Sequence, residues 1–228
     1  MLPSNKSEVK EFSALPQFIR ARSEEQKAER MAEVKAVTAK LFKTHTYHDV
    51  TLSSIGEQLG WSRANLYKYV TSKEEIFLEL AADARDNYFC DLLRTFPIDK
   101  EFNLPTAAIK WAVVSNRNKD WGLYGNILMS IIEVNVSIEK LKTFKKGYYD
   151  TIEILKPHFE AILGIPQKDF SDFLVTIHYH ECGLQGACEK NPLIKEALKE
   201  LGIKSPEPNY KKKMEEFILM CLKQYSTF

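Results

Sequence analysis

Side chains able to contact a nucleic acid are concentrated in one short stretch of the chain, from Thr51 to Lys73. Arg63, Asn65 and Lys68 can donate hydrogen bonds to base edges in a major groove. Other groups in the stretch can hold phosphates, which set the register of a protein on DNA without reading its sequence. We expect phosphate contacts from Thr51, Tyr67, Tyr69 and Lys73, with Ser62 and Ala64 in the same surface. No acidic residue lies between Trp61 and Lys73, so this segment would not repel a polyanion.

A second group of reactive side chains, His178-Tyr179-His180-Glu181-Cys182, contains residue types that bind metal ions. On a helix, His178 and Cys182 would share one face and form a two-point site, whereas His180 would point elsewhere. A third ligand is not evident. We therefore expect core or interface residues of a buried helix here, and no metal.

Patterns typical of enzymes do not occur in the sequence. It has no HExxH, no nucleophile-elbow glycine pattern and no phosphate-binding glycine loop. We expect no catalytic residues, no cofactor and no enzymatic activity. An enzyme built on helices is nevertheless one rival interpretation. The other rival is a helical protein that binds a small molecule or a partner without binding an operator.

Two short helices joined by a tight turn are predicted to position the side chains between Thr51 and Lys73. Thr51 is a good N-cap for a helix over residues 52–59, and Ser62 for a second helix from 63 to about 70. Gly60 lies where the chain must leave the first helix in a left-handed conformation. Gly56 lies where the two backbones would cross. Together these features predict a helix-turn-helix; the alternative is an ordinary helical hairpin with a solvated polar face.

This part of the chain resembles the DNA-binding domain of the TetR family of transcriptional regulators, over roughly residues 24–80. The resemblance rests on short motifs, which are Ala39, Leu41 and Phe42; Thr51, Ile55 and Gly60; Ser62, Leu66-Tyr67 and Tyr69; and Ser72-Lys73-Glu74. The chain departs from the family pattern at His45-Thr46, Gly56, Trp61 and Val70. The resemblance implies a homodimeric repressor that is released from a palindromic operator on double-stranded DNA when a small molecule binds its C-terminal domain.

The remaining segments also have helical periodicity, so the predicted fold class is all-α. We expect an N-terminal arm over residues 1–22, a three-helix DNA-binding domain over 23–75 and a larger helical ligand-binding and dimerisation domain over 76–228. A capping box at Ser23 begins the first helix of the middle domain. Farther on, Asp120 is expected to cap a helix that runs to residue 134. Pro157 is expected to kink or break the helix that Ser137 begins.

An aromatic cluster in the third domain predicts a small-molecule pocket, since such sites are usually concave and lined by aromatic side chains. The candidate lining residues are Trp111, Trp121, Tyr124, Met129, Phe144, Tyr148 and Tyr179. A solid aromatic core is the alternative. The resemblance to TetR regulators favours the pocket, because those proteins carry a ligand-binding C-terminal domain.

Two late helices are predicted to form the dimer interface. Gly183 and Gly186 each cost a helix about 1 kcal/mol relative to alanine, but with Ala187 they make a smooth strip that a partner helix could approach. The last helix is expected to add one apolar face, made of Met214, Phe217, Ile218 and Cys221. Packing of these faces within one subunit is the alternative.

Composition sets the remaining bounds. The 228 residues carry a net charge of +1, so any affinity for DNA must come from the local placement of charge. The four cysteines form no CxxC pair, and no apolar run approaches the roughly 18 residues of a membrane span. No secretory signal is evident in the first residues. We therefore expect a cytoplasmic protein with no membrane partner.

Overall fold

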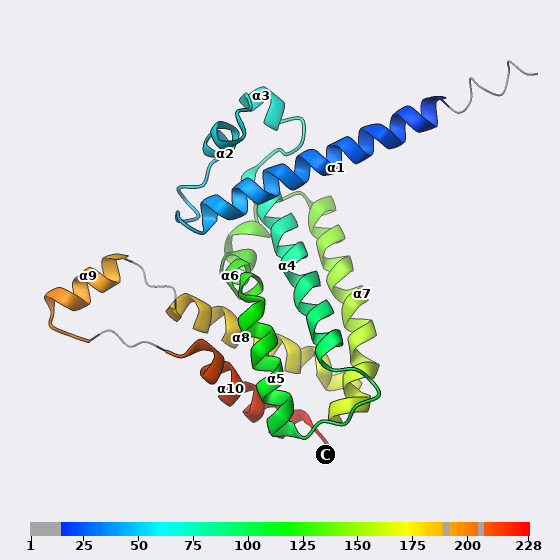
Figure 1. The fold of residues 1–228 in the computed structure, drawn as a ribbon, viewed down its shortest axis with the longest axis vertical. Helices are drawn as coiled ribbons and strands as arrows, with labels where there is room; N and C mark the ends of the chain where they lie inside the picture. The colour runs from blue at the N-terminus through cyan, green and yellow to red at the C-terminus, as the bar shows by residue number, and fades with distance from the viewer. Residues whose placement is uncertain (1–14, 189–191, 205–207) are drawn as a thin grey trace, which may run out of the picture. The chain divides into compact units, whose positions relative to one another are not determined.

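The computed structural model describes residues 15–188, 192–204 and 208–228, and within these ranges the chain contains helices and no β-strand (Figure 1). The all-α prediction is therefore confirmed. The chain divides between Ile76 and Phe77 into two compact units. The boundary lies inside one continuous helix, α4 (Lys73–Thr95), whose first turn belongs to the first unit.

The first unit consists of α1 (Leu15–Phe42), α2 (Leu52–Leu59), α3 (Arg63–Leu66) and the start of α4. Its core is small and aliphatic, because Val34, Ile55 and Leu66 are almost completely excluded from solvent. Thr38 is also buried, and its hydroxyl donates to the Val34 carbonyl at 2.8 Å, which satisfies the polar group inside the helix.

Helix α1 begins earlier than the sequence analysis predicted. Residues 15–22 were assigned to an arm, and Ser23 was expected to cap the helix, but both lie inside α1. Pro16 explains the early start, because its fixed φ suits the first turn of a helix and no helix breaker follows it before Phe42. The rest of the predicted arm, residues 1–14, lies outside the described residues.

The second unit contains the rest of α4, followed by α5 (Leu104–Arg117), α6 (Lys119–Ile127), η1 (Leu128–Ile132), α7 (Ile138–Leu163), α8 (Gln167–Cys188), α9 (Pro192–Glu200) and α10 (Tyr210–Tyr225). Helix α10 packs against both α5 and α8, and α8 also packs against α6 and α7. An aromatic core lies between these helices, where the Trp111 ring contacts Phe96, Phe159 and Phe173.

Three helix limits in the second unit differ from prediction. Asn118, rather than Asp120, precedes α6, and the expected single helix to residue 134 changes at Leu128 into the π-helical turn η1. Pro157 lies within α7 and does not end it. A proline inside a helix costs about 3 kcal/mol; here Leu155, Phe159 and Ile162 on either side are buried, and their burial offsets that cost. The helix expected to reach residue 190 is described to Cys188.

The structure agrees with most of the predicted caps and stops. Gly164 ends α7 with φ 63°, and Asn209 caps α10 by accepting from the Lys212 amide. None of the described helices is both long and apolar enough to cross a membrane.

Candidate nucleic-acid interface and ligand cavity

The turn between α2 and α3 has the geometry that the sequence predicts. Thr51 caps α2 through a reciprocal pair with Ser54, in which each side chain accepts from the other residue's backbone amide at 3.0 Å. Gly60 ends α2 with φ 65°, which only glycine adopts without strain. A β-carbon on Gly56 would lie 3.1 Å from the Trp61 carbonyl oxygen, so the close approach expected at Gly56 is made by the turn backbone.

Helix α3 is shorter than predicted. Ser62 caps it as expected, accepting from the Asn65 amide at 3.2 Å, but the α-helical part ends at Leu66. The Lys68 and Tyr69 amides bond to carbonyls three residues back rather than four, so the chain tightens into a turn that ends near Val70. This tightening leaves Leu66 and Val70 in the core.

The polar side chains of the α3 segment lie at the surface. Ser62, Arg63, Ala64 and Lys68 are exposed, and the Tyr67 ring is 50% exposed. Asn65 and Tyr69 are half-buried. Trp61, large for its position, packs against the Tyr69 ring at 5.5 Å between centroids, and the Arg30 guanidinium lies over its face. Thus α1 supports the segment from behind.

Lys73 is placed differently from the other predicted phosphate contacts. Its ammonium donates to the carbonyls of Tyr47 and Val50 at 2.7 and 2.8 Å, and it lies 3.9 Å from the centre of the Tyr47 ring. Burial lowers the pKa of this amine. Because two of its three protons are already donated, Lys73 holds the loop before α2 and is not a free donor as predicted.

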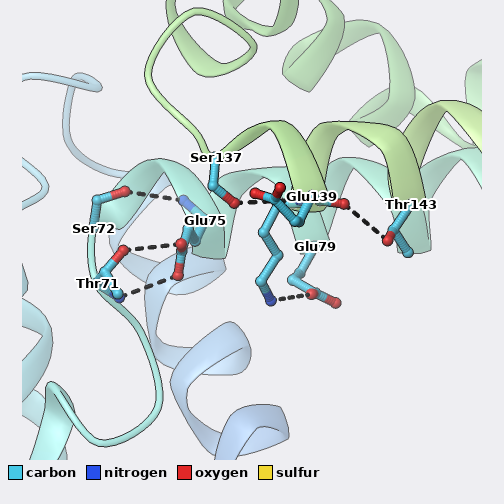
Figure 2. A network of polar contacts seen from close by, with 8 residues as sticks. Thr71, Ser72, Glu75, Glu79, Ser137, Glu139 and Thr143 are labelled. Carbon is cyan, nitrogen blue, oxygen red and sulfur yellow. Dashed lines mark hydrogen bonds and ion pairs between the residues drawn. The ribbon is translucent and has the colours of Figure 1, made fainter.

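The start of α4 is held to the first unit by two glutamates. Glu75 accepts from the Thr71 amide at 3.1 Å and from the Thr71 hydroxyl at 2.9 Å, while the Ser72 hydroxyl accepts from the Glu75 amide (Figure 2). The Tyr47 hydroxyl donates to Glu74, and burial with this bond raises the pKa of Tyr47. Carboxylates in the first turn also suit the positive end of the helix dipole.

A cavity of about 440 Å³ lies within the second unit, between α6, η1, α7 and α8. Five of the seven residues predicted for a pocket line it, namely Trp121, Met129, Phe144, Tyr148 and Tyr179. The other two are outside it. Trp111 belongs to the solid aromatic core, where its indole donates to the Tyr88 hydroxyl at 2.7 Å, and the buried Tyr124 ring packs against Phe77.

The sequence analysis missed nine lining residues: Gly125, Leu128, Glu133, Lys145, Tyr149, Ser171, Asp172, Val175 and His178. Most of them are polar or small and gave no periodic signal. Gly125 was detectable in principle, because a β-carbon there would lie 2.4 Å from the Cys182 sulfur, and glycine inside a helix often marks a close approach. His178 had been considered only as a metal ligand.

The polar groups of the cavity form two clusters. At one side, Lys145 pairs with Glu133 at 2.6 Å. At the other, the His178 ring stacks on Trp121 with centroids 4.3 Å apart, and its Nδ1 lies 3.9 Å from the Glu181 carboxylate. Glu181 is fully buried; one of its oxygens accepts from the Tyr210 hydroxyl at 3.0 Å, and the other has no hydrogen-bond partner among the described residues.

Helix α7 connects the cavity to α4. Its residues Phe144, Lys145 and Tyr148 line the cavity. From α4, the buried Arg85 guanidinium donates to the Phe144 carbonyl at 2.9 Å, and Glu79 pairs with Lys140 at 3.4 Å (Figure 2 shows this pair). A β-carbon on Gly147 would lie 3.0 Å from the Arg85 side chain, so the glycine makes room for this contact.

The predicted dimer residues separate into two groups. Met214 and Ile218 are fully buried and Cys221 nearly so, because α10 uses this stripe to pack on α5 and α8 of its own subunit. The prediction is wrong for these three residues. Gly183, Gly186 and Ala187 are exposed on α8, and Phe217 is half-buried on α10, stacked on His180. A side chain at Gly183 would meet no atom of the described residues.

The His178–Cys182 pair forms a local contact, with the sulfur 3.5 Å from Nε2. Within the described ranges, no three histidine, cysteine or acidic side chains are grouped as a metal site requires.

Comparisons with known proteins match both units. A family model described as bacterial regulatory proteins, tetR family, matches residues 36–80, and one described as tetracyclin repressor-like, C-terminal domain, matches residues 122–224. Together they span more than half of the chain. No curated protein sequence matches it.

Solved structures agree in fold. A bacterial regulatory protein of the tetR family from Rhodococcus RHA1 is similar with a TM-score of 0.53 and 12% identity, covering 86% of this chain and 96% of that one. A transcriptional regulator of the TetR/AcrR family from Thermobifida fusca gives a TM-score of 0.49 and 15% identity over 85% of this chain and 96% of that one. At such identities the likeness concerns the fold alone.

Proposed function

The chain belongs to the TetR family of DNA-binding transcriptional regulators, and on that premise we propose that it is a homodimeric repressor released from a palindromic operator by a small molecule. The observation that carries the proposal is the exposed, carboxylate-free α3 segment at the end of a well-capped turn. As a regulator of this kind it would act in the cytoplasm, on chromosomal DNA, and not as an enzyme.

In the proposed complex the segment from Ser62 to Tyr69 enters the major groove. Arg63, Asn65 and Lys68 contact base edges, and Thr51, Tyr67 and Tyr69 contact phosphates. The α3 residues Ser62 and Ala64 lie in the same surface. Lys73 acts indirectly, by holding the carbonyls of the loop that precedes α2. The exposure of Arg63 and Lys68 supports these roles.

We propose that the dimer forms on the outer faces of α8 and α10. Gly183, Gly186 and Ala187 offer a smooth strip there, and Phe217 with the 58% exposed Met220 supplies apolar surface. The glycine at position 183 meets no packing demand in its own subunit, which supports a close approach by a partner helix. Two copies would read half-sites about one helical turn apart, or a multiple of it.

The effector is proposed to bind in the cavity of the second unit and to act through α7. Arg85 and Glu79 attach the cavity-lining half of α7 to α4, and α4 runs without interruption into the first unit. A ligand that moves α7 would therefore bias α4, and with it the spacing of the two α3 segments.

Selection of bound duplexes from a random DNA pool tests the function directly. We expect an enriched palindrome with half-sites in register, and a loss of enrichment with the Arg63→Ala variant. If the folded dimer selects no sequence, the protein is the alternative considered from the sequence, a helical small-molecule-binding or partner-binding protein without an operator.

A further inference from the structure

We infer that the cavity of the second unit takes an organic cation with a flat aromatic body. This inference rests on the proposed role of the cavity as the effector site, and it names the chemical class of the effector. Two independent properties of the lining support it, namely the number of aromatic faces and the sign of the charge.

Aromatic rings make up much of the cavity wall. Trp121, Phe144, Tyr148, Tyr149 and Tyr179 all line it. The wall already attracts cations, since the Arg85 guanidinium lies 5.1 Å and the Lys145 ammonium 5.9 Å from the centre of the Phe144 ring. A cation over an aromatic face is stabilised by the negative charge of that face, and most strongly over tryptophan. The remaining rings, Trp121 among them, are available for a ligand of the same charge.

The charged groups at the cavity give it a negative sum. Of the lining residues, Glu133 and Asp172 are acidic and Lys145 is basic. Lys145 is already paired with Glu133, so Asp172 is left without a cationic partner in the wall. Its one described hydrogen-bond donor is the neutral Tyr225 hydroxyl, which raises the pKa of Tyr225 and leaves the Asp172 charge uncancelled. Arg85, behind Phe144, has its own carboxylate partner in Asp86.

A third carboxylate lies behind the wall. Glu181 is 0% exposed, and one of its oxygens lacks a hydrogen-bond partner among the described residues. Only the His178 ring separates it from the cavity, with Nδ1 3.9 Å from the carboxylate. A buried carboxylate is stable only when charge or hydrogen bonds compensate it. With Glu181 included, the sum at the cavity is negative whether His178 carries a proton or not, so a cationic ligand supplies the missing compensation and an anion adds to the cost.

The test compares three ring systems of matched size by isothermal titration calorimetry on the full chain without DNA, because flat cations also intercalate. The probes are N-methylacridinium as the cation, acridine at pH 8 as the neutral compound and anthracene-9-carboxylate as the anion. We expect the cation to bind about tenfold more tightly than acridine, and the anion to bind most weakly. Equal or tighter binding of the anion or the neutral compound, or no saturable binding of the cation, would overturn the inference.

Variants of opposite charge effect keep the test independent of stability. Asp172→Asn should weaken cation binding by roughly fivefold to tenfold, and Lys145→Met should strengthen it by a similar factor. The matched control is Glu153→Gln, which removes the same charge from an exposed position of α7 outside the cavity and should change nothing. Two lowered affinities from Asp172→Asn and Lys145→Met would contradict the charge argument.

The ligand class and the proposed function fail in different ways. If the DNA selection yields a palindrome but the cation does not bind, the class is wrong and the regulator assignment stands. If the cation binds as expected but leaves the bound operator in place, the class is right and the release mechanism is wrong.

Discussion

Replacing Lys73 by methionine tests whether this side chain supports the loop before α2 or contacts DNA. Methionine keeps the apolar stem but removes the ammonium that donates to the carbonyls of Tyr47 and Val50 at 2.7 and 2.8 Å. Each hydrogen bond from a charged donor contributes about 1.5–3 kcal/mol, and the contact with the Tyr47 ring adds about 0.5–1 kcal/mol. Because the amine is only partly buried, and its burial costs solvation, the net loss should be about 2–3 kcal/mol.

Hydrogen exchange measured by mass spectrometry on peptides from residues 44–60 is the appropriate assay, since a chain with two units need not unfold in one step. A loss of 2–3 kcal/mol corresponds to roughly 30-fold to 150-fold faster exchange of the protected amides. Peptides from α8 should be unaffected. The matched control is Lys68→Met, which removes the same charge from an exposed side chain of the α3 segment.

Salt dependence of DNA binding separates the two roles. For Lys68→Met we expect unchanged exchange and a salt slope reduced by about one, as for a lost nucleic-acid charge contact. For Lys73→Met we expect faster exchange with the slope unchanged. Exchange within about twofold of the parent, combined with a slope reduced by one, would show that the Lys73 ammonium binds a phosphate and that our structural assignment is wrong.

Three further predictions address base reading, assembly and pH. Asn65→Ala should relax selectivity at one base pair by about 1–3 kcal/mol, as measured by competition between operator variants; unchanged discrimination would exclude Asn65 as a reader. Gly183→Arg should convert the dimer to a folded monomer in analytical ultracentrifugation, whereas Lys199→Ala on α9 should not; a dimeric Gly183→Arg variant would place the interface elsewhere. Burial lowers the pKa of His180 below its ordinary 6.5, so the unfolded chain binds the proton first and stability present above pH 6.5 is lost as the pH falls through that value. His180→Gln should therefore reduce the difference in melting temperature between pH 7.5 and 5.5, and an equal difference in both proteins would refute this.

Features of the first unit were predictable because they depend on neighbours in sequence. The caps at Thr51 and Ser62 and the turn at Gly60 each involve residues within about one helical turn, and the structure has all three where expected. The length of α3 was not predictable in this way. It ends at Leu66 because the following turn must bring Val70 into the core, which is a tertiary demand.

Errors in the second unit arose where a pattern shows an apolar stripe but not its partner. Met214, Ile218 and Cys221 form such a stripe, and only the packing of α10 on α5 and α8 shows that it is used inside the subunit. Trp111 and Trp121 look alike in sequence, yet one lies in the solid core and the other lines the cavity. The roles of Lys73 and Asp172 depend equally on what folding brings near them.

The π-helical turn η1 has a consequence for how the cavity wall tolerates changes in chain length. Its bond from the Glu133 amide to the Leu128 carbonyl at 2.9 Å spans five residues, so the wall contains one residue more than an unbroken α-helix would. Deleting that residue would restore the regular spiral and turn everything beyond it by about 100° relative to α6. Glu133 would then swing away from Lys145 while Trp121 kept its direction, so a single codon lost here would rewrite ligand preference and leave the core sequence untouched.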